Sequence, residues 1–349
     1  MNEPIFIGKK IISKEKPPYI IAEISANHNG SIDMAIKTIQ AAKDSGVDAV
    51  KIQTYTPDTM TIDVDNKDFI INEGLWKGRT LYDLYKEAFT PFEWHKQLFE
   101  FAKKIDITLF SSPFDESAVD LLESLNVPAY KIASFELVDI PLISYIAKKN
   151  KPMLMSTGMA SLSEIGEAIE AARSNGCNSL ALFHCISSYP TPIDQINLSA
   201  IPFLRKEFGI EVGLSDHTLG NLASIVATSL GATVIEKHFT LSRKNGGVDS
   251  TFSLEPYEMR DLVNETKKAF TSLGVNKTIR SDIEQGNKIF RRSLYFVNDL
   301  GEGQIITEKD IRRIRPGFGL DAKYYFEVIG KRTTKNVIKG DRVTLNSFS

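Results

Sequence analysis

Several ionisable side chains in this sequence stand at the ends of short apolar runs, where packing alone would favour apolar residues. The acidic ones are Glu23 and Glu236, and the basic ones are Lys51 and Lys131. Two lysines with serines and backbone N–H groups nearby make a cationic pocket suited to a carboxylate and a phosphate. The alternative is that each lysine simply pairs with a neighbouring carboxylate. The glutamates are candidates for proton transfer or for binding a substrate hydroxyl.

Two histidines, His217 and His238, end two successive apolar runs, so their imidazoles could converge on one metal ion. Two histidine ligands leave coordination positions open, as a catalytic metal site requires. With nitrogen ligands from the protein and oxygen ligands from water or substrate, the sequence favours Mn²⁺ or a similar divalent ion. A packing role is expected for His95 at a helix start, and no role is assigned to His28 in the first loop.

These side chains need a scaffold that brings the ends of the runs together. Short β-branched runs alternate with amphipathic helical patterns, and eight such repeats predict a (β/α)₈ TIM barrel, whose active site lies at the carboxyl ends of the strands. An open doubly wound sheet is the alternative, but no Gly-rich phosphate fingerprint follows the first run. A long excursion over 54–84 predicts an elaborated loop after the second strand. The expected strands are 19–24, 49–53, 108–111, 129–132, 153–156, 180–185, 211–215 and 234–238.

Near residue 275 the alternation of apolar runs and helical patterns gives way to a polar segment and then to short strands and turns, which predicts two domains of unequal size. An N-terminal hairpin and the barrel are expected in 1–275, a polar linker in 276–290, and a small domain of short strands and turns in 291–349. The small domain holds 12 Lys+Arg and 7 Asp+Glu, a net charge of +5 against −7 for the rest. Opposite charges suit docking within or between chains.

Composition excludes several classes of protein. Apolar residues at 42% and charged residues at 25% are ordinary globular values, and a net charge of −2 gives no basic excess for nucleic acid or an anionic membrane. No segment resembles a signal peptide or a membrane-spanning helix. With only Cys177 and Cys185 there is no disulfide framework, so a cytoplasmic location is expected.

A series of motifs runs through nearly the whole chain: IAEISANHNG (21–30), VKIQ (50–53), YKIAS (130–134), GLSDH (213–217) and IEKHF (235–239). Together they resemble the sialic acid synthase family. RSLY (292–295) and RPG (315–317) resemble that family's C-terminal antifreeze-like (SAF) domain. Within the family, segments 53–58, 74–85, 90–95 and 315–320 are most similar to the pseudaminic acid branch.

The resemblance implies a condensation of phosphoenolpyruvate with an open-chain amino-sugar aldehyde, assisted by a divalent metal, with Mn²⁺ favoured over Mg²⁺ or Co²⁺. In the pseudaminic branch the sugar is 2,4-diacetamido-2,4,6-trideoxy-L-altrose, and the products are pseudaminic acid and phosphate. It also implies a domain-swapped homodimer. By matching positions, the metal ligands would be His217 and His238, and the proton-transfer groups would be Glu23 and Glu236. Phosphoenolpyruvate would be bound by Lys51, Lys131, Ser134, Ser156 and Ser215, and the sugar by Gln53, Glu136, Tyr189 and Asp249. Arg315 would reach over the active site of the partner subunit.

Three alternatives stay open at this point. A neuraminate or legionaminate synthase would use the same mechanism on another amino sugar. A related synthase acting on a sugar phosphate would need a second phosphate site and would not need the module 291–349. A non-catalytic carbohydrate-binding protein would have no need of Glu23, Lys51, Lys131, Glu236 and the two histidines together. No role is assigned to His184, where the sequence departs from the neuraminate branch.

Overall fold

Eight short strands close into a parallel barrel in the computed structural model, which describes residues 4–274 and 282–349 of the chain. Around the barrel the order is β10, β3, β4, β5, β6, β7, β8 and β9. Nearly all strand residues are buried, because side chains fill the interior and helices cover the outside. This arrangement confirms the predicted (β/α)₈ barrel. The strands are β3 (Tyr19–Glu23), β4 (Ala49–Thr54), β5 (Thr108–Pro113), β6 (Tyr130–Ile132), β7 (Met153–Ser156), β8 (Leu180–Cys185), β9 (Glu211–Asp216) and β10 (Val234–His238).

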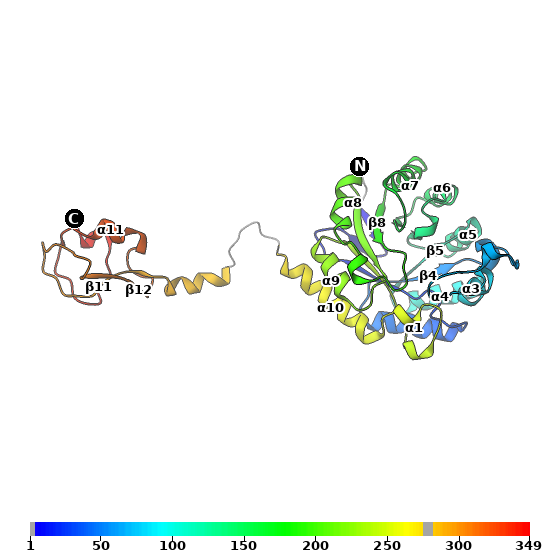
Figure 1. Cartoon of the computed structure of the whole chain (residues 1–349), viewed down its shortest axis with the longest axis horizontal. Helices are drawn as coiled ribbons and strands as arrows, with labels where there is room; N and C mark the ends of the chain where they lie inside the picture. Colours follow the sequence, from blue (N-terminus) through cyan, green and yellow to red (C-terminus); the bar gives the residue numbers. More distant parts are fainter. Residues whose placement is uncertain (1–3, 275–281) are drawn as a thin grey trace. The chain divides into compact units, whose positions relative to one another are not determined.

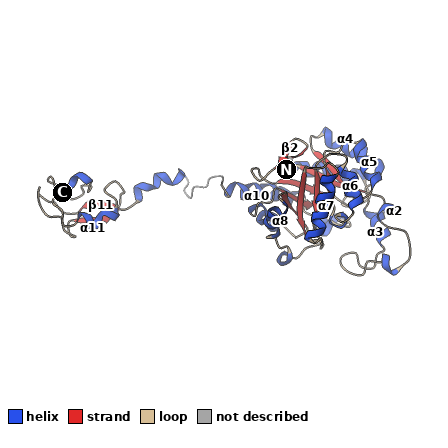
Figure 2. Ribbon diagram, turned by 90° about the horizontal axis from the view of Figure 1, so that it is seen from above, coloured by secondary structure: helices blue, strands red, loops and turns tan. Residues whose placement is uncertain are grey.

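Amphipathic helices surround the barrel, as Figures 1 and 2 show. The first begins where the Ser31 hydroxyl accepts a hydrogen bond from the backbone N–H of Met34, and the chain leaves it at Gly46, whose φ of 88° suits glycine. No helix within the described residues is both long and apolar enough to cross a membrane. The main helices are α1 (Ile32–Asp44), α4 (Phe92–Lys104), α5 (Glu116–Ser124), α6 (Ile140–Ala147), α7 (Leu162–Ser174), α8 (Ala200–Phe208), α9 (Leu222–Ser229) and α10 (Pro256–Ser272).

A small antiparallel hairpin packs against the amino-terminal ends of the barrel strands. It consists of β1 (Ile5–Ile7) and β2 (Lys10–Ile12), whose isoleucines at 5, 7 and 12 belong to the main core. The hydroxyl of Tyr19, at the start of β3, donates a hydrogen bond to the carbonyl of Ile7 at 3.4 Å. The hairpin therefore lies at the end of the barrel opposite the strand ends that carry the predicted site.

The connection from β4 to α4 is the elaborated excursion that the sequence predicted. It contains α2 (Pro57–Met60), a 3₁₀ turn at Lys67–Phe69 and α3 (Leu81–Ala88), and it forms a long loop between α2 and α3 (Figure 2). An isolated antiparallel bridge between Ile70 and Thr80 closes the neck of this loop. The loop follows the carboxyl end of β4, so it belongs to the face of the barrel that carries the predicted site.

The second unit, Val275–Ser349, has a core of its own. Its two strands, β11 (Ser293–Phe296) and β12 (Ile311–Ile314), pair antiparallel, and a short helix, α11 (Tyr325–Val328), packs with them. Within the predicted linker, Asp282–Phe290 forms a 3₁₀ helix whose side chains are all exposed. The core residues are Leu294, Phe296, Ile306, Ile311, Val328, Val337 and Val343.

Candidate active site

The two lysines and two glutamates named from the sequence form one buried cluster inside the barrel. Lys51 Nζ lies 2.8 Å from Glu23 Oε2 and 3.4 Å from Glu236 Oε1, and Lys131 Nζ lies 3.0 Å from the same Glu236 oxygen. None of the four side chains is more than 4% exposed. Each lysine thus does pair with a carboxylate, but the pairs join into a single site.

Strand register explains why residues so distant in sequence meet. Glu23 on β3 stands beside Lys51 on β4 and beside His238 on β10, and Glu236 stands beside Ser215 on β9. Because alternate residues of a strand face the same side, Glu236 and His238 share the barrel interior. The intervening Lys237 forms a fully buried ion pair with Asp216 at 2.9 Å, so this second pair supports the scaffold.

The surroundings push the pKa values of the two carboxyl groups apart. Burial raises the pKa of Glu23, and Lys51 only partly offsets that effect. Burial also opposes ionisation of Glu236, but Lys131 and Lys51 together lower its pKa below the usual range. Burial lowers the pKa of Lys131, whereas Glu23 and Glu236 outweigh burial and raise that of Lys51. Glu236 is therefore a fixed negative charge, and Glu23 is the carboxyl suited to exchanging a proton near neutral pH.

Hydroxyl groups lie beside this cluster. Ser215 Oγ donates to Glu236 Oε1 at 3.2 Å. A Cβ atom added at Gly158 would lie 2.7 Å from Ser134 Oγ and 2.4 Å from Ser187 Oγ, so glycine here leaves room between two serine hydroxyls. The buried hydroxyl of Ser156 has no hydrogen-bond partner among the described residues. Hydroxyl donors near two lysines are the groups that bind phosphate oxygens.

His217 and His238 face one another with their ring centroids 5.4 Å apart. His217 Nδ1 lies 3.0 Å from the Ile186 carbonyl oxygen, which can only accept, so Nδ1 carries the proton and Nε2 is free to bind a metal. Burial lowers the pKa of His238 well below its usual value, which keeps this imidazole neutral, the form that binds metals. His238 Nδ1 lies 3.8 Å from Asp249 Oδ2.

This donor set fits a divalent cation held by two imidazoles, with other positions left to water or substrate. Burial is outweighed by Cys185, which raises the pKa of His217, so a metal bound there would displace a proton. Among the described residues no group of three or more His, Cys, Asp and Glu side chains is arranged to hold a metal. The pair therefore matches an open, reactive site more closely than a closed structural one.

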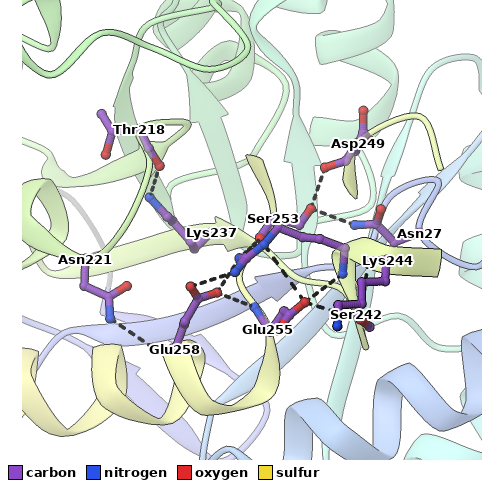
Figure 3. Close-up of polar contacts among 11 residues, drawn as sticks. Asn27, Thr218, Asn221, Lys237, Ser242, Lys244, Asp249, Ser253, Glu255 and Glu258 are labelled. Atoms are coloured by element: carbon purple, nitrogen blue, oxygen red, sulfur yellow. Dashed lines mark hydrogen bonds and ion pairs between the residues drawn. The ribbon is translucent and has the colours of Figure 1, made fainter. Parts of the chain in front are cut away.

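A clamp of hydrogen bonds holds the β10–α10 connection that carries Asp249 (Figure 3). Asn27 Nδ2 donates to Ser253 Oγ at 2.8 Å and to the Phe239 carbonyl at 2.9 Å, and Ser253 Oγ donates to the Asp249 carbonyl at 2.7 Å. The Ser25 hydroxyl donates to the Asp249 carboxylate, while burial raises the pKa of Asp249. The clamp fixes Asp249 beside His238.

The other residues proposed for the sugar side come from different loops. Gln53 follows Lys51 by two positions on β4 and shares its face. Glu136 lies in the 3₁₀ turn after β6, where burial raises the pKa of its carboxyl to about 7. Tyr189, in the loop after β8, lies with its ring centroid 4.5 Å from that of His217. Arg315 belongs to the second unit, where it is exposed just after β12, and its part in the site stays a prediction.

A family model supplies the assignment that these distances leave open. The NeuB family matches residues 38–278, which span β4 to the end of α10 and include both lysines and both histidines. The chain belongs to the NeuB family. The match therefore covers the β4-to-α10 part of the barrel, whereas Glu23 on β3 precedes it.

Relatives extend the NeuB assignment beyond the barrel. The pseudaminic acid synthase of Campylobacter jejuni is 44% identical over 334 residues, 96% of this chain and 97% of that protein. The N,N'-diacetyllegionaminic acid synthase of the same species is 38% identical, over 92% of this chain and 97% of that protein. The solved N-acetylneuraminic acid synthetase of Leptospira borgpetersenii, in complex with citrate, superposes with a TM-score of 0.74 at 32% identity, covering 82% of this chain and 95% of that one.

The remaining histidines of this NeuB-family chain make hydrogen bonds within the protein. His28 accepts from the Gly30 N–H at Nδ1, and His95 lies 2.8 Å from the Thr54 hydroxyl; burial lowers the pKa of each to about 4. His184 Nε2 donates to the Ile196 carbonyl at 2.6 Å.

Sequence reasoning assigned no role to three side chains near the site: Ser187, Phe252 and Trp76, although Trp76 lies in segment 74–85, which carries part of the resemblance. Ser187 stands two residues before Tyr189 in a stretch already assigned to the site, so its position was a usable signal. Phe252 and Trp76 follow no strand directly. Only the folding of their loops brings Phe252 against His238 and Trp76 against Tyr189.

Proposed function

We propose that this enzyme is a pseudaminic acid synthase, which condenses phosphoenolpyruvate with 2,4-diacetamido-2,4,6-trideoxy-L-altrose to give pseudaminic acid and phosphate. The observation that carries the proposal is the buried cluster of Lys51, Lys131, Glu23 and Glu236 beside the histidine pair. Similarity at 44% identity to a pseudaminic acid synthase over 96% of the chain, against 38% to a legionaminic acid synthase, favours this sugar.

The charges of the cluster suit a substrate with two anionic groups. Lys51 and Lys131 would neutralise the carboxylate and the phosphate of phosphoenolpyruvate, and Ser134, Ser156 and Ser215 would donate to their oxygens. The ionised Glu236 holds both ammonium groups in place. In a buried site these interactions are stronger than in water, so they orient the substrate firmly.

The bond changes follow from the two substrates. C3 of phosphoenolpyruvate attacks the aldehyde carbon and forms the new C–C bond, and the aldehyde oxygen takes up a proton. Water then adds at C2, and cleavage of the C2–O bond releases phosphate. Glu23, whose pKa burial raises, would accept the proton from that water.

His217 and His238 would hold a divalent metal ion, with Mn²⁺ favoured, that polarises the aldehyde oxygen as a Lewis acid when bound. Asp249, fixed beside His238, and Tyr189, stacked on His217, would orient the sugar, with Gln53 and Glu136 as further contacts. These residues set the position of the aldehyde relative to phosphoenolpyruvate.

The proposal extends to domain organisation and assembly. Residues 1–275 would form the catalytic domain with its hairpin, 276–290 the linker, and 291–349 an antifreeze-like domain that carries Arg315 to the sugar site of the partner subunit in a domain-swapped homodimer. The net charge of +5 on the small domain supports such docking. A cytoplasmic location is supported by the cysteine content, because two cysteines in 349 residues are too few for a disulfide framework.

An assay with phosphoenolpyruvate and Mn²⁺ tests the proposed reaction, with the trideoxy-diacetamido-altrose compared against N-acetylmannosamine. Phosphate release and product mass are both read, and Glu23→Gln, in which we expect only residual turnover, serves as the control. We expect turnover of the altrose sugar alone. Turnover of N-acetylmannosamine alone would contradict the proposed sugar but keep the mechanism, and turnover of neither would contradict the proposed substrates.

Mixed dimers test the swapped arrangement separately. Arg315→Ala and Lys51→Met are each expected to be inactive alone, because each removes one substrate contact. If Arg315 acts on the partner's site, mixing the two variants restores one intact site per heterodimer. No recovered activity in verified heterodimers would contradict domain swapping.

A further inference from the structure

A row of aromatic rings leads from the two histidines to the loop after β4. Phe252 lies with its ring centroid 4.9 Å from that of His238, and Tyr189 lies 5.4 Å from Phe252 and 4.5 Å from His217. Trp76 continues the row at 5.7 Å from Tyr189. The three aromatic residues come from three different connections, after β4, β8 and β10, so the row exists only in the folded barrel.

Trp76 is held in this position by one specific hydrogen bond. Its indole N–H donates to the carbonyl of Val248 at 3.2 Å, which ties the loop between α2 and α3 to the segment that carries Asp249. An indole has a single donor and no acceptor. Since that donor is already used, the exposed part of Trp76 presents only apolar surface.

We propose that Trp76 is a specificity-determining residue that contacts the C6 methyl group of the sugar. This inference rests on the proposed function and deepens it. The aldehyde carbon, C1, has to lie by His217 and His238, so C6 is the carbon farthest from them along the open chain. Trp76 lies at the far end of the row from the histidines, because Tyr189 stands between Trp76 and His217.

The chemistry of the contact distinguishes a 6-deoxy sugar from a 6-hydroxy sugar. A methyl group against the indole face gains from leaving water. A 6-hydroxyl in the same place would lose its bonds to water and find no partner on Trp76, whose only donor is bound to Val248. Apolar pockets reject an added hydroxyl by up to about a hundredfold, so this contact can supply a useful but bounded preference.

The test compares kcat/KM for the trideoxy sugar with kcat/KM for its 6-hydroxy counterpart, 2,4-diacetamido-2,4-dideoxy-L-altrose. We expect the unmodified enzyme to prefer the 6-deoxy sugar by roughly tenfold to a hundredfold. Trp76→Ala should bring the ratio to within about threefold, and Trp76→Phe should keep most of it, because a ring remains. The KM for phosphoenolpyruvate should stay unchanged in both variants.

A matched control uses the second tryptophan of the chain, Trp94 on α4, whose ring packs edge-on against that of His28 in the loop after β3. Trp94→Phe should keep the preference and leaves Trp76 as the only tryptophan, so its fluorescence should change saturably as the trideoxy sugar is added with phosphoenolpyruvate and Mn²⁺. In Trp76→Phe, the fluorescence of Trp94 should not respond.

Three results would overturn the inference in distinguishable ways. Equal loss of kcat/KM for both sugars in Trp76→Ala would show that Trp76 shapes the loop without reading C6. An unresponsive Trp76 signal during turnover would place the sugar elsewhere. If the unmodified enzyme turns over neither sugar, the proposed function itself fails, and the inference fails with it.

Discussion

Replacing Glu236 with glutamine removes the charge that two buried lysines share while nearly preserving shape. Lys51 keeps Glu23 at 2.8 Å, but Lys131 loses the one carboxylate within ion-pair distance among the described residues. What remains near Lys131 Nζ is the Phe183 ring, 4.6 Å from its centroid. Leaving one buried ammonium without its partner costs about 3–5 kcal/mol, so we expect the free energy of unfolding to fall by about that amount near pH 7.

The loss should shrink as the pH rises. Burial already lowers the pKa of Lys131, and removal of Glu236 lowers it further below the unfolded value of about 10.4. Between those two pKa values the folded state binds fewer protons than the unfolded state, so the free energy of unfolding rises with pH. Glu236→Gln should therefore recover part of its deficit as the pH rises from about 7 towards the unfolded pKa of about 10.4.

Urea denaturation followed by tryptophan fluorescence measures this effect in the intact chain. Both tryptophans, Trp76 and Trp94, lie in the barrel unit, so the signal follows unfolding of the barrel. The double variant Lys131→Met/Glu236→Gln is the control, because it removes the stranded charge and should be more stable than Glu236→Gln alone. A loss below about 1 kcal/mol, or a double variant no more stable than the single one, would refute the reasoning.

The remaining predictions concern catalysis. Gly158→Ala should raise the KM for phosphoenolpyruvate roughly tenfold to a hundredfold, because the new methyl group displaces the hydroxyls of Ser134 and Ser187. The control is Gly166→Ala on α7, where the added Cβ meets nothing closer than 3.9 Å. Equal KM values in the two variants would contradict this prediction. His238→Ala should abolish calorimetrically measured Mn²⁺ binding and turnover while the protein stays folded; retained binding would place the metal elsewhere. Below neutral pH, kcat/KM should fall with an apparent pKa above about 4.3, because burial raises the pKa of Glu23, the proposed base. If the residual activity of Glu23→Gln falls at low pH in the same way as that of the unmodified enzyme, Glu23 is not this base.

Much of the scaffold and part of the site could be predicted from local sequence signals. Strands buried on both faces read as short apolar runs, so a charged residue at the end of such a run, such as Lys51 or His217, stood out against its neighbours. Barrel topology then predicted that these ends meet, since every strand of a (β/α)₈ barrel delivers its carboxyl end to one face. Ser187 was missed because a serine in a polar loop does not contrast with its neighbours, and its closeness to Tyr189 in the sequence was the one signal available.

The sequence by itself determined the eight-fold alternation, the polar strand ends and the family motifs, because each depends on residues close together in the chain. Only the tertiary structure decided that Glu236 is shared by two lysines while Glu23 keeps one, and hence which carboxyl has the raised pKa. Likewise only the fold joins Trp76 to Val248, 172 residues away. Burial and long-range pairing set these properties, and both arise only when the closed barrel brings distant strands and loops into contact.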